Sequence, residues 1–245
     1  MLAKETKYSW YRGTEKKKLL PFFKEENSFA FCSDVPGLMK YFNVTYSPDD
    51  WRFFIDSSKR SLKGVLLHNG NNHPSLPIAH SVVLKESYDN IKLILQKVKY
   101  EDHVWSICGD FKVIGLLLGQ QSGFTKFPCF LCEWDSRDRI SHWEKKEWPS
   151  RQTFTPGIKN IILEPLIDPA KVLLPPLHIK LGLMKQFVRA LDTNRPCFKY
   201  LCNKFPSLSY DKVKSGIFVG PQIRKLMLDS DFENVMCDLE KKCME

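Results

Sequence analysis

The chain has 245 residues, 43% of them hydrophobic and 13% aromatic, so it can build a packed core and is neither disordered nor fibrous. Its 37 Lys and Arg residues outnumber its 28 Asp and Glu residues, which leaves a net charge of +9. The first ten residues are too charged for a secretory signal, and no apolar run approaches the ~20 residues that a membrane span needs. We therefore expect a soluble, intracellular protein with no membrane partner.

Residues 1–48 form a basic N-terminal segment. The first twenty residues hold six Lys or Arg and two Glu, together with Trp10 and Tyr11. Such a segment could bind a phosphate backbone, or it could be a solvated leader in which a few aromatic side chains pack against the protein. Residues 33–40 have the pattern of a helix start.

Residues 49–120 carry the clearest pattern. Three β-rich runs at residues 51–56, 62–68 and 76–84 are separated by turn-forming segments, which predicts an antiparallel meander. A helix over residues 87–100 with Ser87 as its N-cap follows, then a buried strand over residues 103–110 and a helix over residues 111–118 closed by Gly119. The order β-β-β-α-β-α predicts an α/β fold with the mixed sheet of a ribonuclease-H-like core.

The rest of the chain divides into two parts. Residues 121–172 have little periodicity and read as an insertion around a cysteine pair. Residues 173–245 are a helical region that opens with an amphipathic helix carrying Leu177, Leu181, Met184 and Val188 on one face. The last helical pattern is still running at Glu245, so we expect the chain to be truncated.

Two carboxylates close strands of the predicted core, Asp56 at the end of the first and Asp110 at the end of the fourth. Carboxylates on adjacent strands can share a pair of Mg²⁺ ions about 4 Å apart, which would activate the attacking oxygen and stabilise the leaving oxygen of a phosphoryl transfer. The alternative is that each acid caps the backbone that follows it, which is a common role for Asp at the end of an element.

Cys129 and Cys132 have the C-x-x-C spacing of half a zinc site, and His142 and His178 are candidates for the missing ligands. A redox role is disfavoured because the pair does not open a helix after a βαβ strand. The other cysteines read as reduced thiols, and lone histidines are more often ordinary core or surface groups.

Positive charge collects near both acids. Coulomb steering and counterion release could bind a phosphate backbone there without sequence preference, although the same residues could be ordinary solvated cations. Trp134, Trp143 and Trp148 could stack on bases, but they could equally pack the insertion. The candidate nucleic-acid-binding residues are Lys59, Arg60, Lys63, Lys112, Lys126, Arg137 and Arg139.

Four segments, residues 51–63, 107–110, 128–137 and 174–183, resemble a family of transposon-derived proteins of animal genomes. More distantly, an acid-ending strand followed by C-x-x-C is similar to cut-and-paste transposases of the DDE/D class, including the Transib group. This resemblance implies a nuclear, DNA-binding protein in which Asp56 and Asp110 hold Mg²⁺ and the cysteine pair joins histidines around Zn²⁺. It leaves a homodimer open.

The class also carries a third acid, usually Glu, on a later helix. Glu233, Glu240 and Glu245 lie on the last helical piece, but nothing around them matches the motif. We therefore expect a remnant of a metal-dependent DNA strand-transfer enzyme. The rival hypothesis is a domesticated, non-catalytic module that binds DNA or a protein. A small-molecule enzyme is disfavoured, because the chain has no Gly-rich phosphate loop and no nucleophile elbow.

Overall fold

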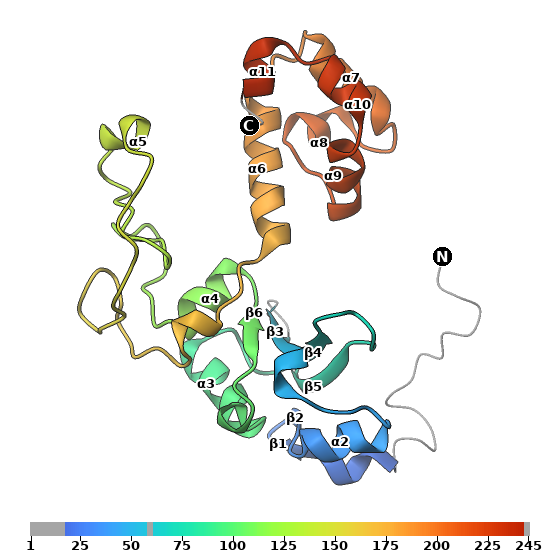
Figure 1. The fold of residues 1–245 in the computed structure, drawn as a ribbon, viewed down its shortest axis with the longest axis vertical. Helices are drawn as coiled ribbons and strands as arrows, with labels where there is room; N and C mark the ends of the chain where they lie inside the picture. The colour runs from blue at the N-terminus through green and yellow to red at the C-terminus, as the bar shows by residue number, and fades with distance from the viewer. Residues whose placement is uncertain (1–17, 58–60, 243–245) are drawn as a thin grey trace. The chain divides into compact units, whose positions relative to one another are not determined.

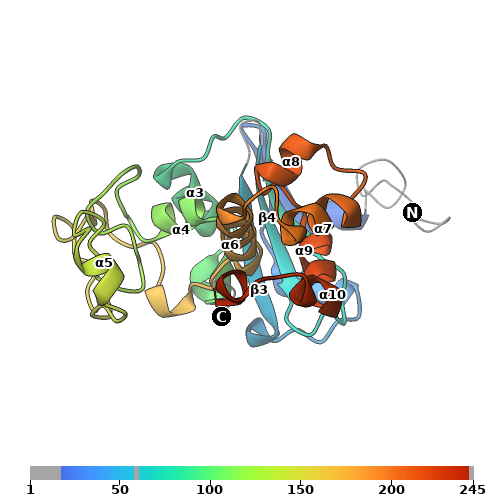
Figure 2. The same cartoon turned by 90° about the horizontal axis from the view of Figure 1, so that it is seen from above.

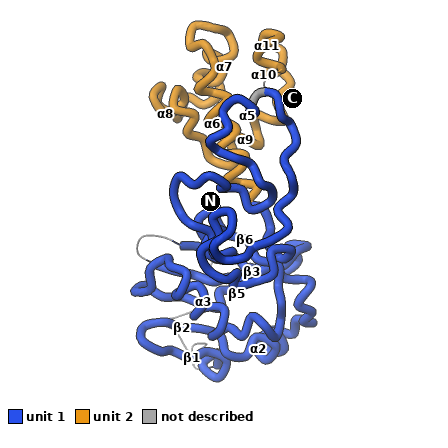
Figure 3. The backbone as a smooth tube through the Cα atoms, turned by 90° about the vertical axis from the view of Figure 1, so that its left-hand side faces the viewer, with its two compact units in different colours: residues 1–174 blue, residues 175–245 orange. Residues whose placement is uncertain are grey.

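The computed structural model describes residues 18–57 and 61–242 and divides into two compact units, Met1–Leu174 and Pro175–Glu245 (Figure 3). The first unit contains a six-stranded mixed sheet with helices, which confirms the predicted α/β class (Figure 1). Within the described residues, no helix combines the length and apolar character needed to cross a membrane. Most of the basic leader, residues 1–17, lies outside the described residues.

The sheet has the strand order β1-β2-β5-β4-β3-β6. All neighbouring strands are antiparallel except β3 and β6, which are parallel, so the predicted meander and crossover strand are both confirmed. A single parallel bridge between Ile107 and Val172 extends the pairing beyond β6. The strands are β1 (Phe23–Glu26), β2 (Phe29–Cys32), β3 (Trp51–Ser57), β4 (Leu62–His68), β5 (Leu76–Ser81) and β6 (Ser106–Cys108).

The β1–β2 hairpin was not predicted from the sequence. Its two loop residues, Asn27 and Ser28, both have positive φ, at 50° and 61°. This is the backbone geometry of the two-residue turns that match the twist of paired strands. β1 carries the exposed charged residues Lys24, Glu25 and Glu26, which suit the outer strand of a sheet but hide its β pattern.

Side-chain caps begin the main helices of the first unit. Asp34, Ser87 and Asp110 each accept a hydrogen bond from the backbone N–H three residues later, at 2.9, 3.2 and 2.8 Å. The helix starts expected at these three positions are therefore confirmed. The helices are α2 (Val35–Tyr41), α3 (Tyr88–Lys97), α4 (Phe111–Leu117) and the short α5 (Ser141–Glu144), with 3₁₀ turns at Leu20–Phe22, Pro48–Asp50, Tyr100–Asp102 and Pro169–Lys171.

One face of the sheet is buried and the other is more open. Trp51, Phe53 and Ile55 of β3 are at most 2% exposed and pack in one core with residues of α2, α3 and α4. The alternate positions of β3, from Arg52 to Asp56, are half-buried or exposed. Because successive side chains of a strand point to opposite faces, Asp56 belongs to the open face.

The second unit is helical, as expected, and has its own core. Met184, Val188, Phe198, Ile223 and Phe232 are each at most 2% exposed and pack together. Figure 2 looks along the longest of its helices, α6. Its helices are α6 (Pro176–Ala190), α7 (Pro196–Lys204), α8 (Tyr210–Lys214), α9 (Gly220–Met227), α10 (Ser230–Asn234) and α11 (Asp238–Lys242).

Candidate functional site at the carboxylate edge

The two predicted acids lie at the carboxyl ends of neighbouring parallel strands. The last residue pair between β3 and β6 is Phe54 with Cys108, and Asp56 and Asp110 each lie two residues beyond that pair. The strands stay close up to that point, because a Cβ on Gly109 would lie 3.1 Å from the carbonyl oxygen of Ile55. Both acids therefore belong to one end of the sheet and, by alternation, to its open face.

Asp110 has the capping role that the sequence left as an alternative. Its Oδ1 accepts the N–H of Val113 at 2.8 Å and so satisfies one of the unpaired donors that begin α4. Asp56 is exposed, and within the described residues its carboxylate makes no hydrogen bond or ion pair. Capping is thus confirmed for Asp110, whereas Asp56 has a carboxylate free to bind a ligand.

A third carboxylate, Glu86, lies beside the same strand end and was not singled out from the sequence. It is 13% exposed, accepts the Ser57 hydroxyl at 2.6 Å and forms an ion pair with Lys112. Glu86 therefore links Ser57, which follows Asp56, to Lys112, which lies two residues after Asp110. Its position just before Ser87, the cap of α3, gave no local signal. We name Asp56, Glu86 and Asp110 the carboxylate edge.

Across the sheet, Asp56 pairs in register with Lys63 of β4, which in turn pairs with His80 of β5. Burial lowers the pKa of His80, and the positive charge of Lys63 lowers it further. His80 is therefore neutral around pH 7. The exposed cation Lys63 therefore lies between Asp56 and His80 in the sheet.

Glu86 and Asp110 already use carboxylate oxygens for contacts within the protein. Glu86 is occupied by Lys112 and Ser57, and Asp110 has one oxygen occupied by its cap. Within residues 18–57 and 61–242, no three His, Cys, Asp or Glu side chains form a group able to hold a metal ion. A metal ion at this edge would therefore need several water ligands, as Mg²⁺ usually keeps in proteins.

The cysteine pair of the insertion forms a local knuckle. The N–H of Leu131 donates to Cys129 Sγ at 3.4 Å, and the pKa of the Cys132 thiol is raised by burial and by its hydrogen bond with Cys129. His142 does not join the pair, because its Nε2 donates to the carbonyl of Asp135 at 2.6 Å and its ring stacks on Trp134. His178 is an exposed residue of α6 in the second unit. In the described first unit these residues do not fit a four-coordinate zinc site.

Arg151 organises the backbone around the cysteine pair. It is 8% exposed, and its guanidinium donates to the carbonyls of Cys129, Lys159 and Phe127, each at 3.1 Å. Burial lowers the pKa of this guanidinium, although the nearby cysteines oppose the shift. A planar group with five fixed donors suits three converging carbonyls. This role could not be predicted from the sequence, because an arginine of the insertion resembles any other surface cation.

The predicted nucleic-acid-binding residues fall into three groups. Lys112 is paired with Glu86, and Lys126 is paired with Asp135 at 3.3 Å. Lys63, Arg137 and Arg139 are exposed and form no ion pair with the described residues. Lys59 and Arg60 lie outside the described residues.

The described tryptophans of the insertion pack against their neighbours. Trp134 stacks on His142 with ring centroids 4.7 Å apart, and His142 meets Trp148 edge-on at 6.1 Å. Lys145 lies over the Trp148 ring. These contacts favour packing of the insertion over base stacking.

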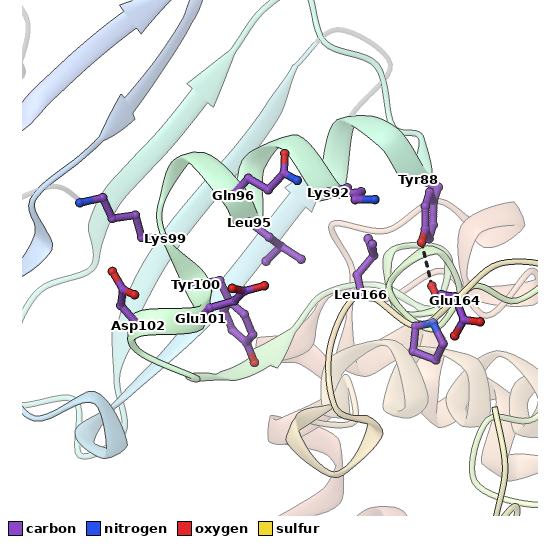
Figure 4. Close-up of a pocket in the computed structure, with 11 residues that line it drawn as sticks. Tyr88, Lys92, Leu95, Gln96, Lys99, Tyr100, Glu101, Asp102, Glu164 and Leu166 are labelled. Atoms are coloured by element: carbon purple, nitrogen blue, oxygen red, sulfur yellow. Dashed lines mark hydrogen bonds between the residues drawn. The ribbon is translucent and has the colours of Figure 1, made fainter. Parts of the chain in front are cut away.

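A separate groove of about 580 Å³ lies between α3 and residues 164–166 (Figure 4). Its wall includes Leu95 and Leu166, and the Tyr88 hydroxyl closes one end by donating to the Glu164 carbonyl at 2.8 Å. Its lining also includes two lysines, Lys92 and Lys99, and three acids, Glu101, Asp102 and Glu164. The groove shares no residue with the carboxylate edge, so the two features are independent.

The family comparisons follow the division into two units. Residues 10–167 match a domain of unknown function (DUF8703), which covers more than half of the chain. The chain belongs to the DUF8703 family. Residues 176–245 match a second domain of unknown function (DUF8704), so the junction of the DUF8703 and DUF8704 regions lies at the boundary after Leu174. No curated protein and no solved structure matches the chain.

Proposed function

We propose that this chain is a nuclear, transposase-derived protein that binds DNA, and that it descends from a metal-dependent DNA strand-transfer enzyme. The observation that carries the proposal is the parallel pairing of β3 with β6, because Asp56 and Asp110 each follow the last residue pair of these strands by two residues. Two carboxylates at the ends of adjacent parallel strands are the first requirement of metal-assisted phosphoryl transfer.

The strand order supports a ribonuclease-H-like core as the finer description of the fold. β5, β4 and β3 form an antiparallel meander, α3 follows it, and β6 returns parallel to β3. This is the arrangement expected from the transposase resemblance. The β1–β2 hairpin extends the sheet on the far side of β5 and leaves the strands that carry the acids in place.

The carboxylate edge favours DNA binding over strand cleavage for this chain. A Mg²⁺ ion bound at Asp56 and Asp110 would neutralise negative charge on a phosphate and polarise it. Asp110 also holds the start of α4, and Glu86 is neutralised by Lys112, so neither is free to complete a second metal site. We therefore propose that the chain retains metal-assisted phosphate binding without turnover, which is the alternative of a domesticated module.

Lys63, Arg137 and Arg139 are the cations of the predicted set best suited to contact phosphates. They are exposed, and none is neutralised by an ion pair with the described residues. Lys112 and Lys126 would have to leave their acidic partners first. Zn²⁺ binding by Cys129 and Cys132 stays a prediction, because His142 is hydrogen-bonded elsewhere.

The proposal is tested with the whole chain, a fluorescent 30-bp DNA duplex and a supercoiled plasmid. We expect duplex binding that weakens steeply between 50 and 200 mM salt, by ~10³-fold or more if six or more phosphates are contacted, with no nicking of the plasmid in Mg²⁺ or Mn²⁺. Metal-dependent nicking that Asp110→Asn abolishes would instead establish an active nuclease. Absence of salt-sensitive binding would refute the DNA-binding proposal.

A further inference from the structure

The second unit separates its charges along the chain. Residues 175–228 contain ten Lys or Arg and two Asp, a net charge of +8, which nearly equals the +9 of the whole chain. Residues 229–242 contain two Lys and five Asp or Glu, a net charge of −3. The helices α6 to α9 are therefore basic, α10 is acidic and α11 is neutral, although none of the residues predicted to bind nucleic acid lies here.

α6 presents its basic residues along one stripe. His178, Lys185 and Arg189 are spaced at i, i+7 and i+11, which places them within about 40° of one another around the helix. All three are exposed, and α6 contains no acidic residue. Lys185 and Arg189 are one turn apart, a rise of about 6 Å along the axis.

The turn after α8 contacts α6, and α8 carries two further lysines. Gly216, which follows α8 with a positive φ of 67°, packs against α6, since a Cβ there would lie 2.6 Å from the Cα of Lys185. Lys212 and Lys214 at the end of α8 are exposed. We name Lys185, Arg189, Lys212 and Lys214 the α6–α8 basic surface; α6 and α8 are labelled in Figure 1.

The charges of this surface are not neutralised by the protein. The ion pairs of the described second unit are Arg195 with Asp192 at 3.8 Å and Lys204 with Asp229 at 2.7 Å. No described acid pairs with a residue of the α6–α8 basic surface. Four unpaired cations on a compact helical scaffold produce a positive field that attracts a polyanion.

We propose that the α6–α8 basic surface is a second DNA-binding surface, which contacts the phosphate backbone of a duplex without reading its sequence. The inference rests on the proposed DNA binding and extends it to the helical unit. The surface offers flexible cations spaced by about one helix turn, and duplex DNA carries one phosphate per about 3.4 Å on each strand. Affinity would come from counterion release as these cations contact the phosphates.

The test compares two triple variants of the whole chain for binding to a random-sequence 30-bp duplex by fluorescence anisotropy. Lys185→Glu with Arg189→Glu and Lys214→Glu reverses three charges of the surface. The matched control, Lys199→Glu with Lys241→Glu and Lys242→Glu, makes the same change in net charge on α7 and α11. Circular dichroism verifies that both variants are folded.

We expect the surface variant to bind the duplex ~10- to 100-fold more weakly at 100 mM salt. The slope of log K against log salt should become shallower by about 2 to 3. The control variant should lose less than ~3-fold in affinity. Equal losses in both variants, or none in the surface variant, would overturn the inference. If wild-type protein binds and only Lys63, Arg137 and Arg139 variants weaken it, the inference fails while the proposed function stands. Equal binding of polyglutamate would show a general polyanion surface and overturn the assignment to DNA.

Discussion

Asp110 is predicted to have two roles, a helix cap and a metal ligand, and two substitutions separate them. Asp110→Asn keeps a side-chain oxygen that can accept the N–H of Val113, whereas Asp110→Ala removes it. Since Asn caps helices about as well as Asp, Asn should cost only a few tenths of a kcal/mol in unfolding free energy. Ala should cost about 1 kcal/mol and lower the melting temperature by about 2–4 °C in a unit of this size.

The assay is urea unfolding followed by tryptophan fluorescence. All six tryptophans precede residue 149, so the signal reports the first unit alone. Binding of Mn²⁺, measured by calorimetry, gives the second readout. We expect Asp110→Asn to lose most Mn²⁺ affinity while keeping its stability, because it removes the charge and keeps the cap.

Asp34 provides the matched control. It caps α2 through the N–H of Gly37 at 2.9 Å, and α2 has the same seven-residue length as α4. Asp34→Ala should lose stability like Asp110→Ala, with Mn²⁺ binding unchanged. The reasoning is refuted if Asp110→Asn destabilises as much as Asp110→Ala, or if it binds Mn²⁺ like the wild type.

Three further predictions concern packing and pH. Arg151→Ala should lower the unfolding free energy by about 2–4 kcal/mol, because three part-buried carbonyls lose a charged donor; a urea-midpoint shift worth less than ~0.5 kcal/mol would contradict this. Gly119→Ala should destabilise more than Gly123→Ala in the same assay. Both glycines have positive φ, but only at Gly119 would a Cβ lie 2.0 Å from the carbonyl oxygen of Leu163, so equal losses would refute the clash. Burial lowers the pKa of His103 in the folded protein. The neutral His103 side chain therefore contributes its full stabilisation above the unfolded pKa of about 6.5, and this stabilisation is lost as pH falls below that value. Urea midpoints from pH 8 to 5 should fall less in His103→Asn than in the wild type, and parallel curves would count against this linkage.

His103 belongs to a half-buried hydrogen-bond chain. Trp105 Nε1 donates to the Tyr46 hydroxyl at 2.9 Å, and that hydroxyl is hydrogen-bonded to His103 Nδ1, also at 2.9 Å. The His103 ring stacks on Trp105 with centroids 4.3 Å apart. These contacts remove part of the ring from water, and this desolvation disfavours its charged form.

Several structural features could be predicted from the sequence because their signals are local. The caps at Asp34, Ser87 and Asp110 act within three residues, so residue type and spacing were sufficient. The meander from β3 to β5 was recognised from turn residues between β-rich runs. The β1–β2 hairpin was missed because β1 is charged, so its β pattern depends on pairing with β2 rather than on its own residues.

The sequence by itself determined the α/β class, the helix caps, the excess of positive charge and the identity of the two strand-end acids. Only the tertiary structure decided that β3 and β6 pair in parallel, that Glu86 joins Ser57 to Lys112, and that Arg151 donates to three carbonyls of other segments. The physical reason is separation along the chain. A cap or turn is stabilised by neighbours a few residues away, whereas these contacts join segments up to 54 residues apart and form only when the whole core packs.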